Sequence, residues 1–571
     1  MTTIEPPPPD APHLEATSLD ERPPLDPPAA PPSGRKSGLM RNSLINAAFT
    51  LISRLAGFAR DLVIAAYLGA SGNIMADAYA TAQQFPNLFR RIFAEGAFST
   101  AFVPSYSAAL ERDGKEKADK MAHDAMATLV FITVIFTFCV ELAMPWLMLW
   151  LKPGFAANPE KLKWTIIFTQ ITMPYLPCMA IVAHLAGVLN ARGKFVLSAG
   201  VPILLNAVTL VSILPTHSAF QSALWGSIGT IFAGMLQALL LLWGANKTGA
   251  HVSLSIVPVF SKDINKLLLL AVPGALAAAA TQVNVFVSQF FSSTVNGATM
   301  WLTIADRFYQ LPLGLVGVAI GSALLPALSR AVHAEDHEHA QTTMDQAFVF
   351  AMVFALPAAV ALVAMPFFLV DGVYTRAGFH LNDSVQVGKL LAQYGWGVPA
   401  FVLTRILNPA FFARKDTFGP MKFAMVSVVV NIVVGVTMFH LIGVPGLAMG
   451  TSAAAWLNVV LMVVTLARRK FWIVGGKALR RLLLVLVAAG IMAGFCAYAS
   501  YSRPLIEGFI GQFLPAHNGI HAISILGHKA IGTKEIAIVL VSLTGVFLYI
   551  ALLFGTGAFR PAELKALIRR K

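Results

Sequence analysis

The feature that most constrains this sequence is the recurrence of long apolar runs along nearly its whole length. Fourteen such runs follow residue 40, separated by short polar segments or by glycine and proline. A helix of about 20 apolar residues crosses the hydrocarbon core of a bilayer. Hydrophobic residues make up 57% of the chain and charged residues 12%, whereas soluble domains carry about 25% charged residues. We therefore expect an all-α integral membrane protein with about fourteen transmembrane helices.

The expected spans are approximately 41–69, 75–109, 122–151, 162–191, 196–215, 220–244, 264–293, 297–330, 343–372, 385–413, 419–441, 444–467, 477–500 and 535–557. Several are longer than a bilayer requires, so we expect those helices to tilt, kink or protrude.

Lysine and arginine gather in alternate loops, which indicates the orientation. The basic loops lie at 112–120, 192–194, 247–266, 414–422 and 468–470, and the intervening turns at 71–75, 215–222, 293–300 and 443–446 contain neither residue. The main exception is the 152–163 loop, which holds Lys152, Lys161 and Lys163. Because positive residues resist translocation, both termini are expected in the cytoplasm and the helix number is expected to be even.

The chain divides into four expected segments. They are a Pro-rich tail over 1–38, a lobe of six spans over 39–245, a second six-span lobe over 246–470, and the last two spans with a basic cytoplasmic tail over 471–571. The Pro-rich tail lacks the apolar stretch of a signal peptide and is expected to be disordered in the cytoplasm. The two lobes show signs of an internal duplication. In the second span of each lobe an aspartate is followed by a proline, Asp77 and Pro86 in the first lobe and Asp306 and Pro312 in the second. Transporters built from such repeats bind substrate between the halves.

Charged residues inside the apolar spans are the candidate functional residues. They are Arg54, Arg60 and Asp61 in the first span, Asp77, Arg90, Arg91 and Glu95 in the second, Asp306 and Arg307 in the eighth, and Arg405 in the tenth. A charge that faces lipid is costly, so these residues should face a wet cavity or one another. One interpretation is that they form ion pairs between or within helices, such as Arg91 with Glu95. The excess of arginine over carboxylate favours an anionic substrate, because the planar guanidinium binds two phosphate oxygens at once.

A helical wheel of the second span gives a further expectation. At 100° per residue, Asp77, Gln84, Arg91 and Glu95 share one face within about 40°, while Arg90 points elsewhere. Pro86 lies between these residues and is expected to kink the helix.

Several motifs together resemble one family. They are SRLAGFARD at 53–61, ADA at 76–78, FPNLFRRIFAEGAF at 85–98, ADR at 305–307 and LPALS at 325–329. This set resembles the MurJ (MviN) lipid II flippases of the MOP exporter superfamily. The resemblance covers about residues 40–560, and the stretch 53–107 is highly specific.

The resemblance implies two six-helix lobes in a V around a cationic cavity, and two further helices that form a groove for a polyprenyl tail. It implies a flippase that moves lipid II, an undecaprenyl-diphosphate-linked glycopeptide, to the outer leaflet of a bacterial inner membrane. Lipid II, membrane lipids and the cell-wall synthesis machinery are the implied partners. The cavity charges of the family match Arg54, Arg60, Asp77, Arg90, Arg307 and Arg405 here. Gln84 stands where a cavity lysine is common.

Two other kinds of membrane protein share some of these features. An exporter of drugs or of oligosaccharide lipids would share the architecture, but drug substrates are mostly cations and the arginine excess disfavours them. A membrane enzyme acting on polyprenyl phosphates should show clustered carboxylates or a metal motif. Neither is present, and no P-loop or hydrolase triad is found, so no enzyme activity, metal or cofactor is expected. Nucleic-acid binding is disfavoured because the chain has no basic soluble domain.

Overall fold

The computed structural model describes residues 34–93, 99–250, 252–514, 516–517, 520–525 and 528–558. Contacts divide the chain between Leu44 and Ile45, and the architecture described here is that of the second unit, Ile45–Lys571. This unit is built almost entirely of helices, as expected from the apolar runs.

In the part of the first half that the structure describes, there are eight α-helices and one short 3-10 helix. They are α1 (Gly34–Leu68), α2 (Ile74–Arg90), α3 (Ser99–Arg112), α4 (Lys115–Leu151), η2 (Pro153–Ala157), α5 (Pro159–Thr172), α6 (Tyr175–Ala191), α7 (Phe195–Ile213) and α8 (Ala219–Lys247).

The second half contains the remaining helices. They are α9 (Lys262–Ser292), α10 (Ala298–His333), α11 (His337–Ala364), α12 (Pro366–Tyr374), α13 (Leu381–Gly395), α14 (Val398–Phe412), α15 (Phe418–Ile442), α16 (Pro445–Arg468), α17 (Gly476–Tyr501), α18 (Arg503–Gly511) and α19 (Thr533–Gly555).

Each expected span coincides with one helix or with two consecutive helices. The junctions α5–α6 and α11–α12 fall at Pro174 and Pro366, where proline lacks the N–H that would continue the ladder. Within the described residues, nine helical segments are long and apolar enough to cross a membrane. The all-α membrane class is therefore confirmed, while the count of fourteen spans stays a prediction.

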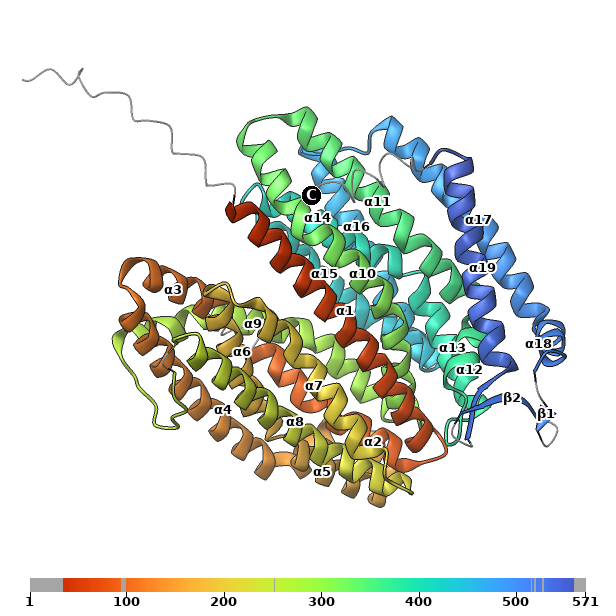
Figure 1. Cartoon of the computed structure of the whole chain (residues 1–571), viewed down its shortest axis with the longest axis horizontal. Coiled ribbons are helices and arrows are strands. Elements are labelled where there is room, and N and C mark those ends of the chain that lie inside the picture. Colours follow the sequence, from red (N-terminus) through yellow and green to blue (C-terminus); the bar gives the residue numbers. More distant parts are fainter. Residues whose placement is uncertain are drawn as a thin grey trace, which may run out of the picture. The chain divides into compact units, whose positions relative to one another are not determined.

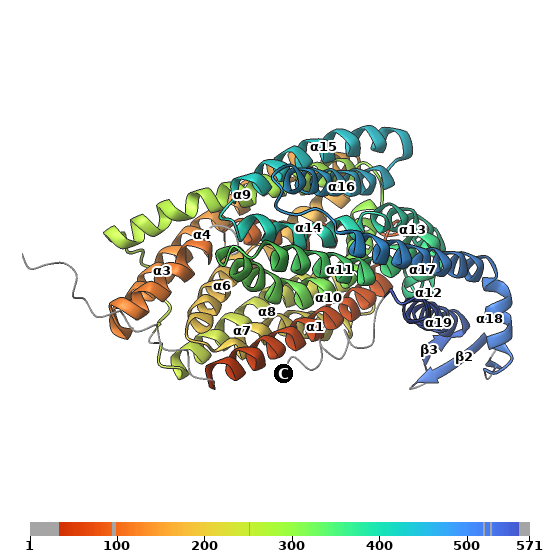
Figure 2. The same cartoon turned by 90° about the horizontal axis from the view of Figure 1, so that it is seen from above.

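Two buried apolar clusters lie mainly in one half of the chain each. One joins α3, α4, α6 and α8 and also takes in Ile264 and Leu267 of α9, and the other joins α11, α14, α16, α17 and α19. A third cluster lies where α1 ends and α2 and α10 begin, and it contains residues of both halves. From Ile45 onward, α1 (red) runs beside α10 in Figures 1 and 2, and Phe58 of α1 packs against Phe308 of α10. Helix α9 contacts α3 and α4 of the first half as well as α15.

A small antiparallel sheet between α18 and α19 was not expected from the sequence. It consists of β1 (Ala516–His517), β2 (Ile520–Ile525) and β3 (His528–Gly532) in the order β1-β2-β3. Ala516 pairs with His521 and Ala522 with Gly532, with a register shift between Ile523 and Ser524. These strands give too short an alternation to be recognised beside the apolar runs.

Candidate functional site

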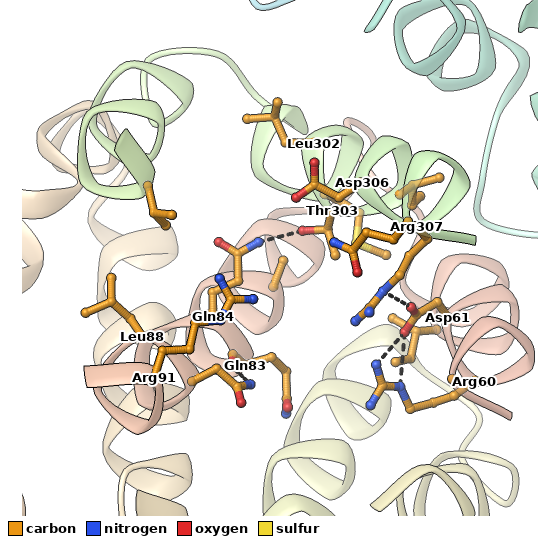
Figure 3. A pocket seen from close by; sticks show the side chains of 18 of the residues that line it. Arg60, Asp61, Gln83, Gln84, Leu88, Arg91, Leu302, Thr303, Asp306 and Arg307 are labelled. Atoms are coloured by element: carbon orange, nitrogen blue, oxygen red, sulfur yellow. Dashed lines mark hydrogen bonds and ion pairs between the residues drawn. The ribbon is translucent and has the colours of Figure 1, made fainter. Parts of the chain in front are cut away.

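A cavity of about 550 Å³ lies between the two halves, walled chiefly by α1, α2, α9 and α10. Its charged lining consists of Arg54, Arg60, Asp61, Arg90, Arg91, Asp306 and Arg307. Five arginines and two aspartates leave a surplus of three positive charges among the described lining residues. Figure 3 shows Arg60, Asp61, Arg91, Asp306 and Arg307 around one space, on different helices.

Asp61 is shared by arginines from both halves. The Nη2 atom of Arg60, its neighbour on α1, lies 2.7 Å from Asp61 Oδ1, and Arg307 Nε of α10 lies 2.5 Å from Asp61 Oδ2. Figure 3 shows the two guanidinium groups approaching the carboxylate from different sides. A single negative charge thus balances only part of two positive ones. The cluster can accept a further anion.

Arg54 also lines the cavity from α1, six residues before Arg60. Its Nη1 donates to the backbone carbonyl of Gln310 at 2.9 Å, and its charge is repelled by Arg307 and Arg405. A methyl group at Gly314 would lie 2.3 Å from Arg54 Nη1, so this glycine leaves the room that the guanidinium occupies. Arg405 is exposed and does not itself line the cavity.

Arg90 and Arg91 both line the cavity, which corrects the helical wheel. The wheel pointed Arg90 away and grouped Arg91 with Asp77. Helix α2 continues through Pro86 to Arg90 and is followed by a π-helical turn over 91–93. The backbone N–H of Arg91 still bonds to the carbonyls of Asn87 and Leu88, so the helix keeps its regular step as far as Arg91. Arg90 and Arg91 are about 100° apart around the helix axis, and both long side chains reach the same cavity. Arg90 Nε donates to Asn87 Oδ1 at 3.0 Å.

Gln84 connects α2 to both α9 and α10 through a directed chain of hydrogen bonds. The Thr303 hydroxyl donates to the Thr299 carbonyl at 2.8 Å, so it accepts from Gln84 Nε2 at 2.6 Å (Figure 3). Gln84 Oε1 in turn accepts from the side-chain amide of Gln289. A lysine at position 84 has donors only and could not complete this chain.

Asp77 does not line the cavity but is buried at the junction of the two halves. Its Oδ2 lies 2.6 Å from Lys161 Nζ of α5 and accepts from the Gly297 N–H at 2.8 Å, while Oδ1 accepts from Met300 N–H at 3.2 Å. Gly297 and Met300 form the start of α10, where the helix dipole favours a negative charge. Asp77 therefore joins α2 and α5 to the second half.

Sequence reasoning missed the partners of Asp77. Lys152 and Lys161 were the exceptions to the alternation of basic loops, and both are buried, with 0% and 2% of their surface exposed. Both lysines lie on the side whose short turns at 71–75, 215–222, 293–300 and 443–446 contain no lysine or arginine. That exception was the signal that could have identified them as interior residues.

The structure thus places the predicted site residues in three groups. Arg54, Arg60, Arg90, Arg91 and Arg307 line one cavity, and Asp77 and Arg405 lie outside its lining. Glu95 falls outside the described residues.

Comparison with known proteins identifies the family. The family described as "Lipid II flippase MurJ" matches residues 64–516, most of the chain. This chain belongs to the MurJ family. A probable lipid II flippase MurJ of Rhizobium tropici is 36% identical over 483 residues, which cover 84% of this chain and 90% of the relative. The lipid II flippase MurJ of Burkholderia cenocepacia is 30% identical over 463 residues, covering 80% of this chain and 89% of that one.

Solved structures agree on the fold of the MurJ family. A lipid II flippase MurJ in an inward closed conformation has a TM-score of 0.69 at 22% identity, covering 90% of this chain and 99% of that one. An inward-facing multidrug resistance MATE transporter of the MOP superfamily has a TM-score of 0.60 at 14% identity, covering 75% of this chain and 98% of that one. The expected MOP-type architecture is therefore confirmed.

Proposed function

We propose that this protein is a lipid II flippase that moves the undecaprenyl-diphosphate-linked peptidoglycan precursor from the inner to the outer leaflet of the cytoplasmic membrane. The observation that carries the proposal is the arginine-rich cavity between the halves, in a chain whose relatives are named lipid II flippases. The protein acts as a transporter rather than as an enzyme. No observation favours an exporter of drugs or oligosaccharide lipids instead.

The diphosphate of the substrate fits the cluster around Asp61. Arg60 and Arg307 each present a fork of donors, and Asp61 satisfies only part of each. A diphosphate offers several oxygens and can engage both forks, which is the geometry in which arginine binds phosphate most strongly. Further positive charge in the cavity comes from Arg54, Arg90 and Arg91. Outside the lining, Asp77 holds α2 against the start of α10, and Arg405 adds a positive charge near Arg54.

Binding of the anion would also drive the lobe movement. Arg60 belongs to the lobe over 39–245 and Arg307 to the lobe over 246–470, so a diphosphate held by both draws the lobes together. In the empty cavity the unbalanced arginines repel one another. The substrate thus stabilises a conformation that the empty protein disfavours, as alternating access requires.

We place the protein in the bacterial inner membrane as a multi-pass protein with both termini in the cytoplasm. The burial of Lys152 and Lys161 supports this orientation, because these lysines are satisfied inside the protein rather than exposed on the translocated side. The cell-wall synthesis machinery is the proposed class of partner.

Reporter fusions test the orientation. Fusions at Lys571 and at Lys117 are both expected to give a cytoplasmic signal, because basic residues flank both positions. A reporter active only in the periplasm, such as alkaline phosphatase, and one active only in the cytoplasm, such as green fluorescent protein, should be compared at each site. A periplasmic signal at either site would overturn the fourteen-span orientation.

Depletion of the protein tests the function itself. In a strain whose only copy is repressible, lipid II is expected to accumulate in the inner leaflet and to disappear from the outer one. The measurement is leaflet-resolved detection, with a periplasmic enzyme or probe that reaches only outward-facing lipid II. Unchanged outer-leaflet lipid II after depletion would refute the proposed function.

A further inference from the structure

Two buried lysines and one carboxylate occupy the contact between the two halves at the end where α1 terminates. Lys161 Nζ lies 2.6 Å from Asp77 Oδ2 and 3.2 Å from Asn296 Oδ1. Lys152 Nζ lies 2.9 Å from Thr299 Oγ1 and 3.4 Å from Ser292 Oγ. Lys161 thus has a carboxylate partner, whereas the hydrogen-bond partners of Lys152 in the described residues are hydroxyl groups.

The two lysines are enclosed at this contact, where 0% of the surface of Lys152 and 2% of that of Lys161 are exposed. Gly154 N–H donates to Ser293 Oγ at 3.0 Å, and a methyl group at Gly154 would lie 2.4 Å from the Ser293 carbonyl oxygen. The ring of Phe155 lies below both ammonium groups, 5.3 Å from Lys152 Nζ and 4.2 Å from Lys161 Nζ. The contact can therefore exist only where η2 and the α9–α10 turn touch.

The charge balance of this contact depends on Lys152. The charged groups that face it are Asp77 of α2 and Lys161 of α5, while α9 and α10 present the hydroxyls of Ser292 and Thr299. With both lysines protonated, two positive charges share one negative charge in a dry site. With Lys152 neutral, the Lys161–Asp77 pair is balanced, and the amine of Lys152 can still hydrogen-bond with the hydroxyls.

From this arrangement we propose that Lys152 is a proton-binding site that couples proton uptake to separation of the two lobes at this end of the transporter. When the lobes touch, burial among hydroxyl groups favours the neutral amine of Lys152. When they separate, water reaches Lys152 and it binds a proton, which then opposes closure. The protein would thus take up one proton each time this contact opens and release it each time the contact forms.

The direction of the pH effect follows from the burial of Lys152. Desolvation, together with the charge of Lys161, lowers the pKa of Lys152 from 10.5 to about 7 in the closed contact. The separated contact, with a hydrated lysine, binds the proton more tightly. Between pH 10.5 and 7 each unit of acidification therefore favours separation by up to about tenfold, and the effect saturates below pH 7.

The test is a distance measurement on the full-length protein without substrate. The native cysteines, Cys139, Cys178 and Cys496, are first replaced. Spin labels are then attached to the variants His217→Cys, between α7 and α8, and Leu441→Cys, near the end of α15. Both labelled positions are exposed and lie on opposite halves. The protein is placed in nanodiscs of phosphatidylethanolamine and phosphatidylglycerol. Pulsed electron paramagnetic resonance then measures the distance distribution between the two labels, which gives the open and closed populations from pH 7 to 9.

The expected result is a rise in the open-to-closed ratio of up to about a hundredfold from pH 9 to pH 7, set by one proton. Lys152→Met should stay closed without this pH dependence, and Lys152→Arg, which cannot lose its proton, should favour the open form throughout. Lys163→Met is the matched control, because Lys163 is exposed beside Trp164, and it should keep the wild-type response.

Two results would overturn the inference. One is a wild-type ratio that does not change with pH over this range, and the other is a Lys152→Met variant that keeps the wild-type slope. Because the readout is a distance in the absence of lipid II, it is independent of the leaflet assay. The proton site can fail while the flippase function stands, and the reverse also holds.

Discussion

Replacing Arg307 with alanine is expected to abolish transport at a normal level of protein in the membrane. Arg307 is the arginine that α10 contributes to the cluster around Asp61. Without it, Arg60 of α1 is the arginine of this cluster that remains to bind the diphosphate. Each charge-assisted hydrogen bond contributes about 1.5–3 kcal/mol. Loss of a two-bond contact should therefore lower substrate affinity at least about a hundredfold. The measurement is complementation of a depletion strain, with membrane abundance determined in parallel.

Two further variants sharpen this result. Arg307→Lys keeps the charge but loses the planar fork, so it should give partial complementation or none. Arg330→Ala is the control, because Arg330 is an exposed residue on the same helix and lies outside the cavity lining. It should complement fully. If Arg54→Ala, Arg90→Ala and Arg307→Ala all transported lipid II at the wild-type rate, the cationic-cavity mechanism would be wrong.

The helices could be predicted from the sequence because a membrane span is a local property. About 20 apolar residues suffice to define it, and charged or proline-rich segments mark its limits. The arginines of the cavity could also be predicted, since charges within apolar spans require a polar environment. That Arg54, Arg60 and Arg307 surround one space depends on how α1 and α10 pack, which no local pattern encodes.

The role of Asp77 shows where sequence reasoning stopped. A helical wheel gives the direction of a side chain but not the element that it faces. Asp77 lies in the same expected span as the cavity residues Arg90 and Arg91, yet its carboxylate faces Lys161 and the start of α10. Lys161 falls in the 152–163 loop of the sequence analysis, because short helices such as η2 and the first turn of α5 carry little apolar periodicity. The pairing of Asp77 with Lys161 joins positions 84 residues apart, which no local pattern indicates.

Replacing Asp77 with asparagine is expected to lower the stability of the protein strongly. Asparagine keeps the shape and one acceptor but removes the only negative charge that directly contacts Lys161 in the described structure. An uncompensated buried charge costs about 3–5 kcal/mol. The thermal unfolding midpoint of the purified protein in detergent should therefore fall clearly below that of the wild type.

A double variant separates the charge effect from a general loss of packing. In Asp77→Asn with Lys161→Met no unpaired ammonium remains at this pair, so the midpoint should recover part of the loss. Asp113→Asn is the control, because Asp113 lies 3.5 Å from the exposed Arg112, and surface pairs contribute about 0–1 kcal/mol. Its midpoint should not change. If Asp77→Asn unfolded at the wild-type temperature, Lys161 would have another compensating partner and the junction of the two halves would not depend on this ion pair. The proton site assigned to Lys152 would then lose the charge imbalance on which it rests.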